Sequence, residues 1–214
     1  MKLSEHKKTL IISSIITLFP IIIGLILWPQ LPEEIATHFN ASGVPDDYSP
    51  KIFAVVGLPL LLLFAHWLAV AAVIADPKKN NISPKVFGVI IWIIPILSLV
   101  MCSVTYLYGL GMDIKIEIIC VLLLGVSFIL FGNYLPKCQQ NYSIGIKLPW
   151  TLEDEENWNK THRLGGYLWT LLGLSIILGG FLNCSWVILP AIISGCIIPT
   201  IYSYTLYISK KNKK

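Results

Sequence analysis

The stretch GNYLPKCQQNYSIGIKLPWTLEDEENWNKTHRLGG, from Gly132 to Gly166, is the longest polar passage between two apolar parts of this chain. It is neither a terminus nor a simple turn, and it concentrates aromatic, basic and acidic residues. The residues on both sides of it are almost all apolar. Because the hydrocarbon core of a membrane excludes exposed irregular backbone, we expect this stretch to connect two membrane-spanning helices.

The chain is too apolar for an ordinary soluble domain. Of its 214 residues, 55% are hydrophobic and only 13% are charged, and the mean hydropathy is +0.72. Because one helix crosses the hydrocarbon with roughly 20 residues, this length accommodates about six spans and short loops. The predicted fold is all-α, a polytopic bundle of six transmembrane helices in a single membrane domain, residues 1–214.

Apolar runs place the six spans along the chain. They are expected at residues 9–28, 52–75, 86–108, 118–135, 166–182 and 186–208, with an extracellular loop at 29–51 and a cytoplasmic loop at 136–165. The first run could also be a signal peptide, because basic residues precede it. It is longer than a signal-peptide core and no A-x-A site follows it, so a membrane helix is the better interpretation.

The distribution of Lys and Arg predicts the orientation. Of the 16 such residues, all but Lys51 and Lys115 lie at the two termini or in the second and fourth loops. By the positive-inside rule, both termini face the cytoplasm and the loop 29–51 faces outward. We therefore expect a multi-pass membrane protein, in contact with membrane lipids. The same dispersion of basic residues argues against direct binding of nucleic acid.

Familiar catalytic and metal-binding motifs do not occur in the sequence. It contains no HExxH, GxSxG or Gly-rich phosphate loop, and its five cysteines have no CxxC spacing. No Asp, Glu, Lys or Arg lies deep in a predicted span. We therefore expect no catalytic residue, no metal, no cofactor and no enzymatic activity.

Two features of the predicted spans stand out. His66, in LFAHWLAV, is an ionisable residue inside the second span, where it is either functional or a neutral imidazole bonded to a neighbouring helix. In the fifth span, Gly166, Gly173 and Gly180 recur every seven residues. They share one face, which predicts close approach of another helix.

The extracellular loop PQLPEEIATHFNASGVPDDYSPK is long enough to be functional. Pro32 followed by two Glu residues predicts a first helical turn, and the segment Asn40 to Asp47 predicts tight turns. The loop could fold around a divalent metal, but its spacing matches no closed site, so a solvated acidic loop is the better interpretation. The candidate ligand-binding residues of this loop are Glu34, His38, Asn40 and Asp46.

The second half of the cytoplasmic loop has a helix-start pattern. Thr151 and Asp154 fit [ST]-x-x-[DE], which predicts a helix from about Leu152 to Arg163 and a stop or bend at Gly165. In such a helix Glu156 would pair with Lys160, and Trp158 would share a face with His162. The helix could be an interfacial anchor or a docking surface for a cytosolic partner, and the pattern alone favours neither.

The same loop carries a resemblance. GNYLPK, NYSIGIKLPWTL and the pattern E-x-x-W-x-K-T-H-R-x-G-G resemble the signature of the SdpI family of bacterial membrane proteins. Upstream, LPEEIATHFNASGVPDDYSPK resembles a short domain of unknown function that commonly precedes this signature. The positions that match the signature are Asn133, Tyr134, Pro136, Asn141, Gly145, Lys147, Pro149, Trp150, Thr151, Trp158, Lys160, Thr161, His162 and Arg163.

The resemblance implies a multi-pass protein of the bacterial plasma membrane that gives immunity against a secreted peptide toxin. It also implies a receptor that holds a small cytosolic helix-turn-helix autorepressor at the membrane. Two other classes stay open: a peptide or lipid transporter, and an enzyme acting on lipid or envelope precursors with His162, Arg163 and Lys147 facing a phosphate.

Overall fold

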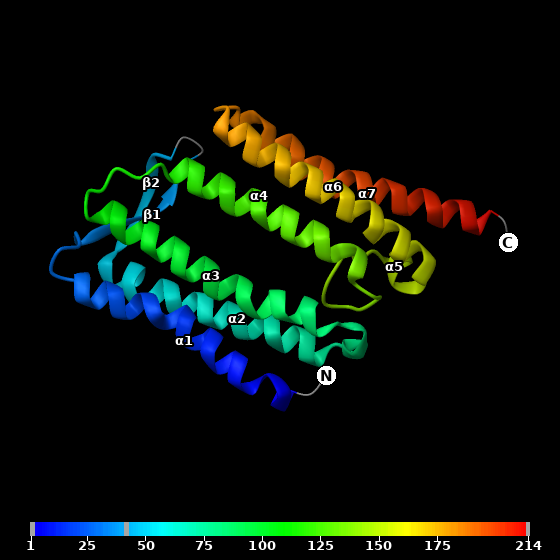
Figure 1. Cartoon of the computed structure of the whole chain (residues 1–214), viewed down its shortest axis with the longest axis horizontal. Coiled ribbons are helices and arrows are strands. Elements are labelled where there is room, and N and C mark those ends of the chain that lie inside the picture. The colour runs from blue at the N-terminus through cyan, green and yellow to red at the C-terminus, as the bar shows by residue number, and fades with distance from the viewer. Residues whose placement is uncertain (1–2, 41–42, 213–214) are drawn as a thin grey trace. The chain divides into compact units, whose positions relative to one another are not determined.

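The computed structural model describes residues 3–40 and 43–212. Lys2, Lys213 and Lys214, counted among the basic residues of the termini, and positions 41–42 of the predicted extracellular loop lie outside this description. The described chain contains six helices that are long and apolar enough to cross a membrane, which confirms the predicted helical membrane bundle. They are α1 (Leu3–Leu27), α2 (Leu58–Ala75), α3 (Pro84–Gly109), α4 (Ile116–Tyr134), α6 (Glu155–Phe181) and α7 (Ile188–Lys211) (Figure 1).

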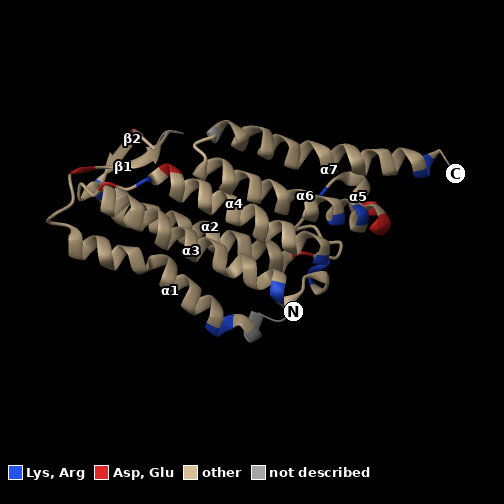
Figure 2. Cartoon of the chain, turned by 45° about the horizontal axis from the view of Figure 1, so that its top comes forward, with Lys and Arg blue, Asp and Glu red and all other residues tan. Residues whose placement is uncertain are grey.

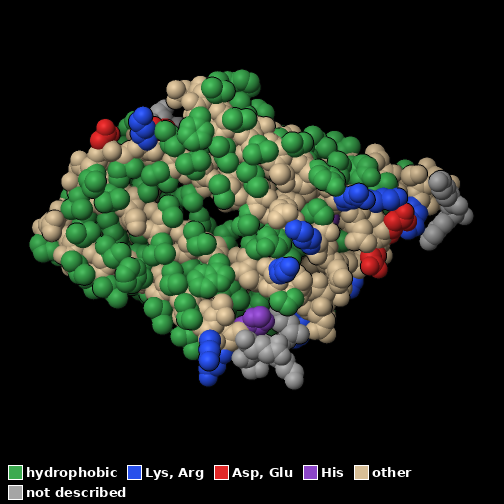
Figure 3. All heavy atoms as spheres, in the orientation of Figure 1, with side chains coloured by type: hydrophobic (Ala, Val, Ile, Leu, Met, Phe, Trp, Pro, Cys, Tyr) green, Lys and Arg blue, Asp and Glu red, His purple; other side chains and the backbone are tan. Residues whose placement is uncertain are grey.

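The surface of the long helices is that of a membrane protein. Large apolar side chains are exposed along them, including Phe64, Leu171 and Leu189 at 67%, 63% and 65% exposure. Hydrophobic side chains dominate the face drawn in Figure 3. The charged residues gather near helix ends and in connections (Figure 2). This pattern suits contact with lipid along the helices and with water at their ends.

The chain divides into two compact units, Met1–Ile74 with Phe87–Glu117 and Ala75–Val86 with Ile118–Lys214. The single membrane domain expected from the sequence, and its orientation, stay predictions.

The first unit contains a β-hairpin between its first two long helices. Strand β1 (Glu34–Phe39) pairs antiparallel with β2 (Pro45–Pro50), and a π-helical segment η1 (Phe53–Gly57) leads from the hairpin into α2. Ile35 of β1 is fully buried in a core cluster with Leu31, Ala54, Val55, Cys102 and Tyr106.

The hairpin corrects the predicted helical turn at Pro32. The Glu33 carbonyl accepts a hydrogen bond from the Lys51 N–H at 2.8 Å, which closes the end of the hairpin. The Glu33 carboxylate also pairs with the Lys51 ammonium at 2.9 Å, although it is itself 90% exposed. Strand pairing and burial of Ile35 therefore outweigh the local preference of Pro and Glu for a helix start.

In the second unit, α4 and α6 approach each other at glycines. A Cβ on Gly173 would lie 2.6 Å from the carbonyl oxygen of Gly125, and a Cβ on Gly166 would lie 2.7 Å from that of Gly132. Backbone atoms cannot give way as side chains can, so only glycine permits this distance. The glycines that recur every seven residues on α6 are thus confirmed as a face of close helix packing. We call this contact the seam.

The short elements of the second unit are η2 (Lys79–Asn81), η3 (Leu135–Lys137), α5 (Pro149–Glu153) and η4 (Ser185–Val187). The predicted helix from Leu152 to Arg163 is wrong in its bounds. Asp154, not Thr151, caps α6, because its carboxylate accepts from the N–H groups of Glu156 and Asn157. The Thr151 hydroxyl instead accepts from the Leu148 N–H at the start of α5.

The predicted stop or bend at Gly165 is also wrong. Residue Gly165 is buried and lies inside α6, which runs without interruption to Phe181. A Cβ at Gly165 would lie 2.9 Å from Ile146, so this glycine provides room for the loop that crosses it.

Candidate functional site

The family-like residues of the second unit surround a buried pair of rings. Trp158 and His162, one turn apart on α6, stack with ring centroids 3.9 Å apart and are both buried. The spacing had predicted that they share a face, and this is confirmed. Trp158 Nε1 donates to the carbonyl of Cys138 at 2.7 Å, so the pair holds the loop that follows η3.

Both nitrogens of His162 are occupied. Nε2 lies 2.9 Å from the backbone nitrogen of Ile146, and Nδ1 lies 2.8 Å from the carbonyl oxygen of Trp158. An amide N–H can only donate and a carbonyl can only accept, so His162 is neutral with its proton on Nδ1. It therefore has no open nitrogen with which to act on a lipid headgroup.

Gly145 and Thr151 shape the loop against this imidazole. Gly145 has φ = 119°, and a Cβ there would collide with His162 Nε2. Only glycine combines this backbone conformation with this proximity. The buried Thr151 hydroxyl accepts from the Leu148 N–H at 2.9 Å and lies 3.0 Å from the carbonyl oxygen of Ile146.

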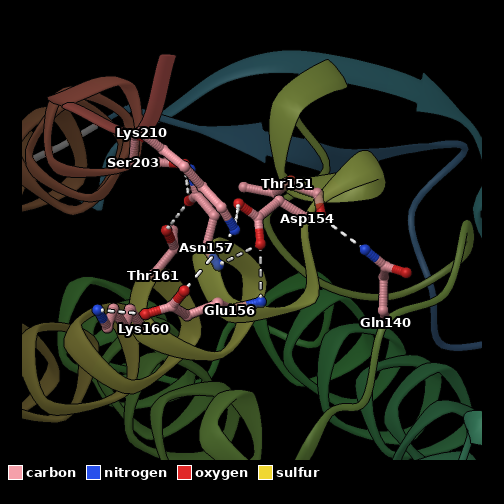
Figure 4. Close-up of polar contacts among 9 residues, drawn as sticks. All are labelled: Gln140, Thr151, Asp154, Glu156, Asn157, Lys160, Thr161, Ser203 and Lys210. Carbon is pink, nitrogen blue, oxygen red and sulfur yellow. Dashed lines mark hydrogen bonds and ion pairs between the residues drawn. The ribbon is translucent and has the colours of Figure 1, made fainter. Parts of the chain in front are cut away.

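Asn157 joins α6 to α7. Its Oδ1 accepts from the hydroxyls of Thr161 at 2.9 Å and Ser203 at 2.7 Å, and its Nδ2 donates to the Ser203 carbonyl at 2.9 Å. Trp150 Nε1 donates to the same Ser203 hydroxyl at 2.8 Å (the Asn157 contacts are drawn in Figure 4). A single fully bonded network thus ties α5, α6 and α7 together.

An ion-pair chain lies at the surface of the same corner. Lys210 pairs with Asp154 at 2.7 Å and Lys160 pairs with Glu156 at 2.8 Å (Figure 4), the second pair as the sequence predicted. The hydrogen bond from Lys210, with those from the α6 backbone, lowers the pKa of Asp154. An open hollow of about 240 Å³ is lined by Asp154, Glu156, Asn157, Lys160, Leu206, Ser209 and Lys210.

Asp76, which no sequence motif marks, anchors the loop from the other side. Its carboxylate accepts from the Lys78 N–H at 2.7 Å, the Tyr142 N–H at 2.8 Å and the Ser143 hydroxyl at 2.6 Å. Burial alone would raise the pKa of Asp76, but these hydrogen bonds outweigh it and lower the pKa below its usual value. The charged carboxylate therefore holds the loop against the turn after α2. We call these three hydrogen bonds the Asp76 clasp.

Asn141 and Gln140 complete this clasp. The Oδ1 of the buried Asn141 accepts from the N–H groups of Ser143 and Ile144 at 2.9 and 2.7 Å. Gln140 donates to the Thr151 carbonyl at 2.8 Å (Figure 4), and its side chain accepts from the Lys78 ammonium. The loop thus folds on itself and on α5.

The predicted cytoplasmic site residues fall into two groups. Asn141, Thr151, Trp158, Thr161 and His162 are buried and support the loop from inside, and we call these five, with Asn157, the loop core. Asn133, Lys147, Lys160 and Arg163 are exposed, and Tyr134 and Trp150 are partly buried.

The candidate residues of the predicted extracellular loop lie on the hairpin of the first unit. Glu34, His38, Asn40 and Asp46 are all exposed. The structure brings two of them together, with His38 Nδ1 2.5 Å from Asp46 Oδ1. Across the residues that the structure describes, no three His, Cys, Asp or Glu side chains are placed to hold a metal ion.

His66 is buried in the first unit and bonds to α1. Its Nε2 lies 3.1 Å from the hydroxyl of Ser13, which itself donates to the Leu10 carbonyl at 2.9 Å. The contact joins α1 to α2. Its Nδ1 is a buried atom without a hydrogen-bond partner in the described chain.

Comparison with known proteins places this loop in a family. The model of the SdpI/YfhL protein family matches residues 137–203, which include the loop core and most of α6 and α7. This segment of the chain thus has the sequence of the SdpI/YfhL protein family. A second model, described as a domain of unknown function (DUF1648), matches residues 15–63, from α1 through the hairpin into α2.

One curated relative in this family aligns along nearly the whole chain. The chain is 27% identical over 207 residues to the "Immunity protein SdpI" of Bacillus subtilis (strain 168), covering 94% of this chain and 96% of the relative. The six candidate spans and this similarity make the chain a multi-pass membrane protein. No solved structure matches it.

Proposed function

We propose that this protein is an immunity protein of the bacterial plasma membrane, which protects its own cell against a secreted peptide toxin. The observation that carries the proposal is the similarity to an immunity protein along 94% of the chain. The loop core supports the proposal as well. Its polar side chains form hydrogen bonds to each other and to the backbone, so they are not free to act on a substrate. This arrangement suits a binding or signalling protein better than an enzyme.

The toxin meets the hairpin of the first unit. The hairpin is the folded polar element on the side that the charge distribution assigns to the exterior. It presents Glu34, His38 and Asp46 to solvent while Ile35 fixes it to the helices below. A rigid β-hairpin loses little conformational entropy when it binds a partner.

Deleting the gene and exposing the cells to a panel of secreted peptide toxins tests immunity. The deletion is expected to sensitise the cells to at least one toxin, and a plasmid copy of the gene should restore growth. Unchanged sensitivity across the panel would refute immunity.

We also propose that the side predicted to be cytoplasmic holds a cytosolic helix-turn-helix repressor when toxin is sensed. The corner of α5, α6 and α7 supports this, because it is folded, exposed and carries adjacent acidic and basic residues beside a hollow. Reversing exposed charges there, as in E153K/E155K, should abolish capture of the repressor from cell extract by the purified protein. Capture that survives the charge reversal would refute this surface.

A further inference from the structure

The seam between α4 and α6 fixes where one exposed cation lies. The contacts of Gly132 with Gly166 and of Gly125 with Gly173 set an antiparallel register between the two helices. In this register Arg163 lies level with Leu135, which begins η3 just beyond the end of α4. Arg163 is exposed and therefore lies on α6 just beyond the part of this helix that packs against α4.

Aromatic contacts distinguish the two sides of the seam. Trp169 of α6 contacts Phe128 and Phe131 of α4 at centroid distances of 5.3 and 6.4 Å, on the side where its Nε1 donates to Gly195 of α7. At about 100° per residue, Asn133 points to the opposite side of α4 from Phe131. By the same rotation, Arg163 lies on the side of α6 away from Trp169. Asn133 and Arg163 thus share the side that α7 leaves open.

Lys137 completes a group of donors on this side. Its ammonium donates to Asn133 Oδ1 at 3.0 Å and lies 5.2 Å from the centroid of the Tyr134 ring. Within the part of the chain that the structure describes, Asp154 and Glu156 form ion pairs with Lys210 and Lys160, and no ion pair joins a carboxylate to Lys137 or Arg163. Two cations and an amide therefore lie on the same side of the seam, and neither cation has an ion-pair partner among the described residues.

The surface of α6 beyond this group is apolar. Following Arg163 into the helix, an exposed stripe consists of Tyr167, Leu171, Leu174 and Leu178, at 62%, 63%, 47% and 61% exposure. A ligand that fills both regions needs an anionic head and a hydrocarbon tail. Arg is well suited to the head, because its planar guanidinium matches the oxygens of a phosphate.

We propose that Arg163, Lys137 and Asn133 bind the phosphate of an anionic phospholipid whose acyl chain lies along the α6 stripe. The site uses none of the residues named for the proposed toxin and repressor surfaces. On the side predicted to be cytoplasmic, anionic lipids attract basic residues by about 1 kcal/mol for each Lys or Arg near the surface.

Native mass spectrometry of the delipidated, full-length protein in detergent tests the site. Phosphatidylglycerol is titrated against the wild type, K137Q/R163Q and the charge-matched control K85Q/K211Q, whose lysines are also exposed but belong to α3 and α7. We expect K137Q/R163Q to weaken phosphatidylglycerol binding about tenfold or more, because each tenfold change corresponds to about 1.4 kcal/mol. The control should bind like the wild type, and R163K should retain part of the binding.

Two further arms separate the sources of phosphate. Phosphatidylcholine should bind more weakly than phosphatidylglycerol, and inorganic phosphate at millimolar concentration should not displace the bound lipid. Equal losses in the two double variants, or none in either, would overturn the site. Displacement by inorganic phosphate would support phosphate recognition but overturn its assignment to lipid.

Discussion

His162 Nε2 accepts a hydrogen bond from the Ile146 N–H at 2.9 Å, so a residue of α6 fixes the backbone of the loop in front of it. Replacing His162 with Ala leaves this N–H and the Trp158 carbonyl without their partners and removes the ring stacked on Trp158. We expect H162A to lower stability by about 2 kcal/mol or more, since each unpaired buried group costs about 1–3 kcal/mol. Thermal unfolding in detergent measures this. H38A, which changes an exposed histidine, should leave the midpoint nearly unchanged.

Gly145 should not tolerate alanine. Both its φ of 119° and the collision of a Cβ with His162 Nε2 oppose a side chain at this position. A strained backbone alone costs about 1–3 kcal/mol, so G145A should unfold several degrees below the wild type. G88A is the matched control, because a Cβ on Gly88 of α3 meets nothing within 4 Å. A G145A protein as stable as G88A would contradict the described loop.

The Asp76 clasp predicts a pH-dependent contribution to stability. Hydrogen bonds hold the pKa of folded Asp76 below its ordinary value of 3.8. The contribution is therefore present above the unfolded pKa and disappears as pH falls through the folded pKa. At pH 7, D76N should be destabilised by about 1.5–3 kcal/mol, the range for hydrogen bonds to charged groups.

Chemical denaturation of wild type and D76N at pH 7 and below pH 4 measures this difference. The deficit of D76N should shrink at the lower pH. D113N, which changes an exposed carboxylate, serves as the control. A deficit that is constant over the whole range would show that the charge of Asp76 does not matter.

The seam predicts that volume at Gly173 is poorly tolerated. A Cβ there lies 2.6 Å from the Gly125 carbonyl oxygen and 2.9 Å from the Ile129 nitrogen, both backbone atoms. G173V must therefore push α4 and α6 apart, and we expect a large drop in the yield of folded protein from membranes. G195A should be milder, because its new Cβ would meet only side-chain atoms, at 3.2 Å or beyond. Similar yields from the two variants would argue against a close seam.

Periodic features were predictable from the sequence. The apolar runs predicted six helices, the heptad of Gly166, Gly173 and Gly180 predicted a close helix contact, and the one-turn spacing of Trp158 and His162 predicted a shared face. These succeed because helix geometry alone relates residues three, four or seven apart.

Features that depend on distant partners were not predictable. Asp76 lies in a short turn, and the groups it binds, Tyr142 and Ser143, are more than 60 residues away. The helix start failed because Thr151 and Asp154 are both good caps, and the tertiary contact of Thr151 with the Leu148 turn decides between them. The hairpin was missed because its strands are short and each end of β2 is a proline.

Transfer of protection tests the central claim most directly. A toxin-sensitive bacterium that lacks any relative of this protein would express the full chain, and the minimum inhibitory concentration of the peptide toxin would be measured with and without expression. Immunity predicts that expression raises this concentration, and that H162A, which loosens the loop core, raises it less. An unchanged inhibitory concentration, with the wild-type protein verified as folded in the membrane, would contradict the account.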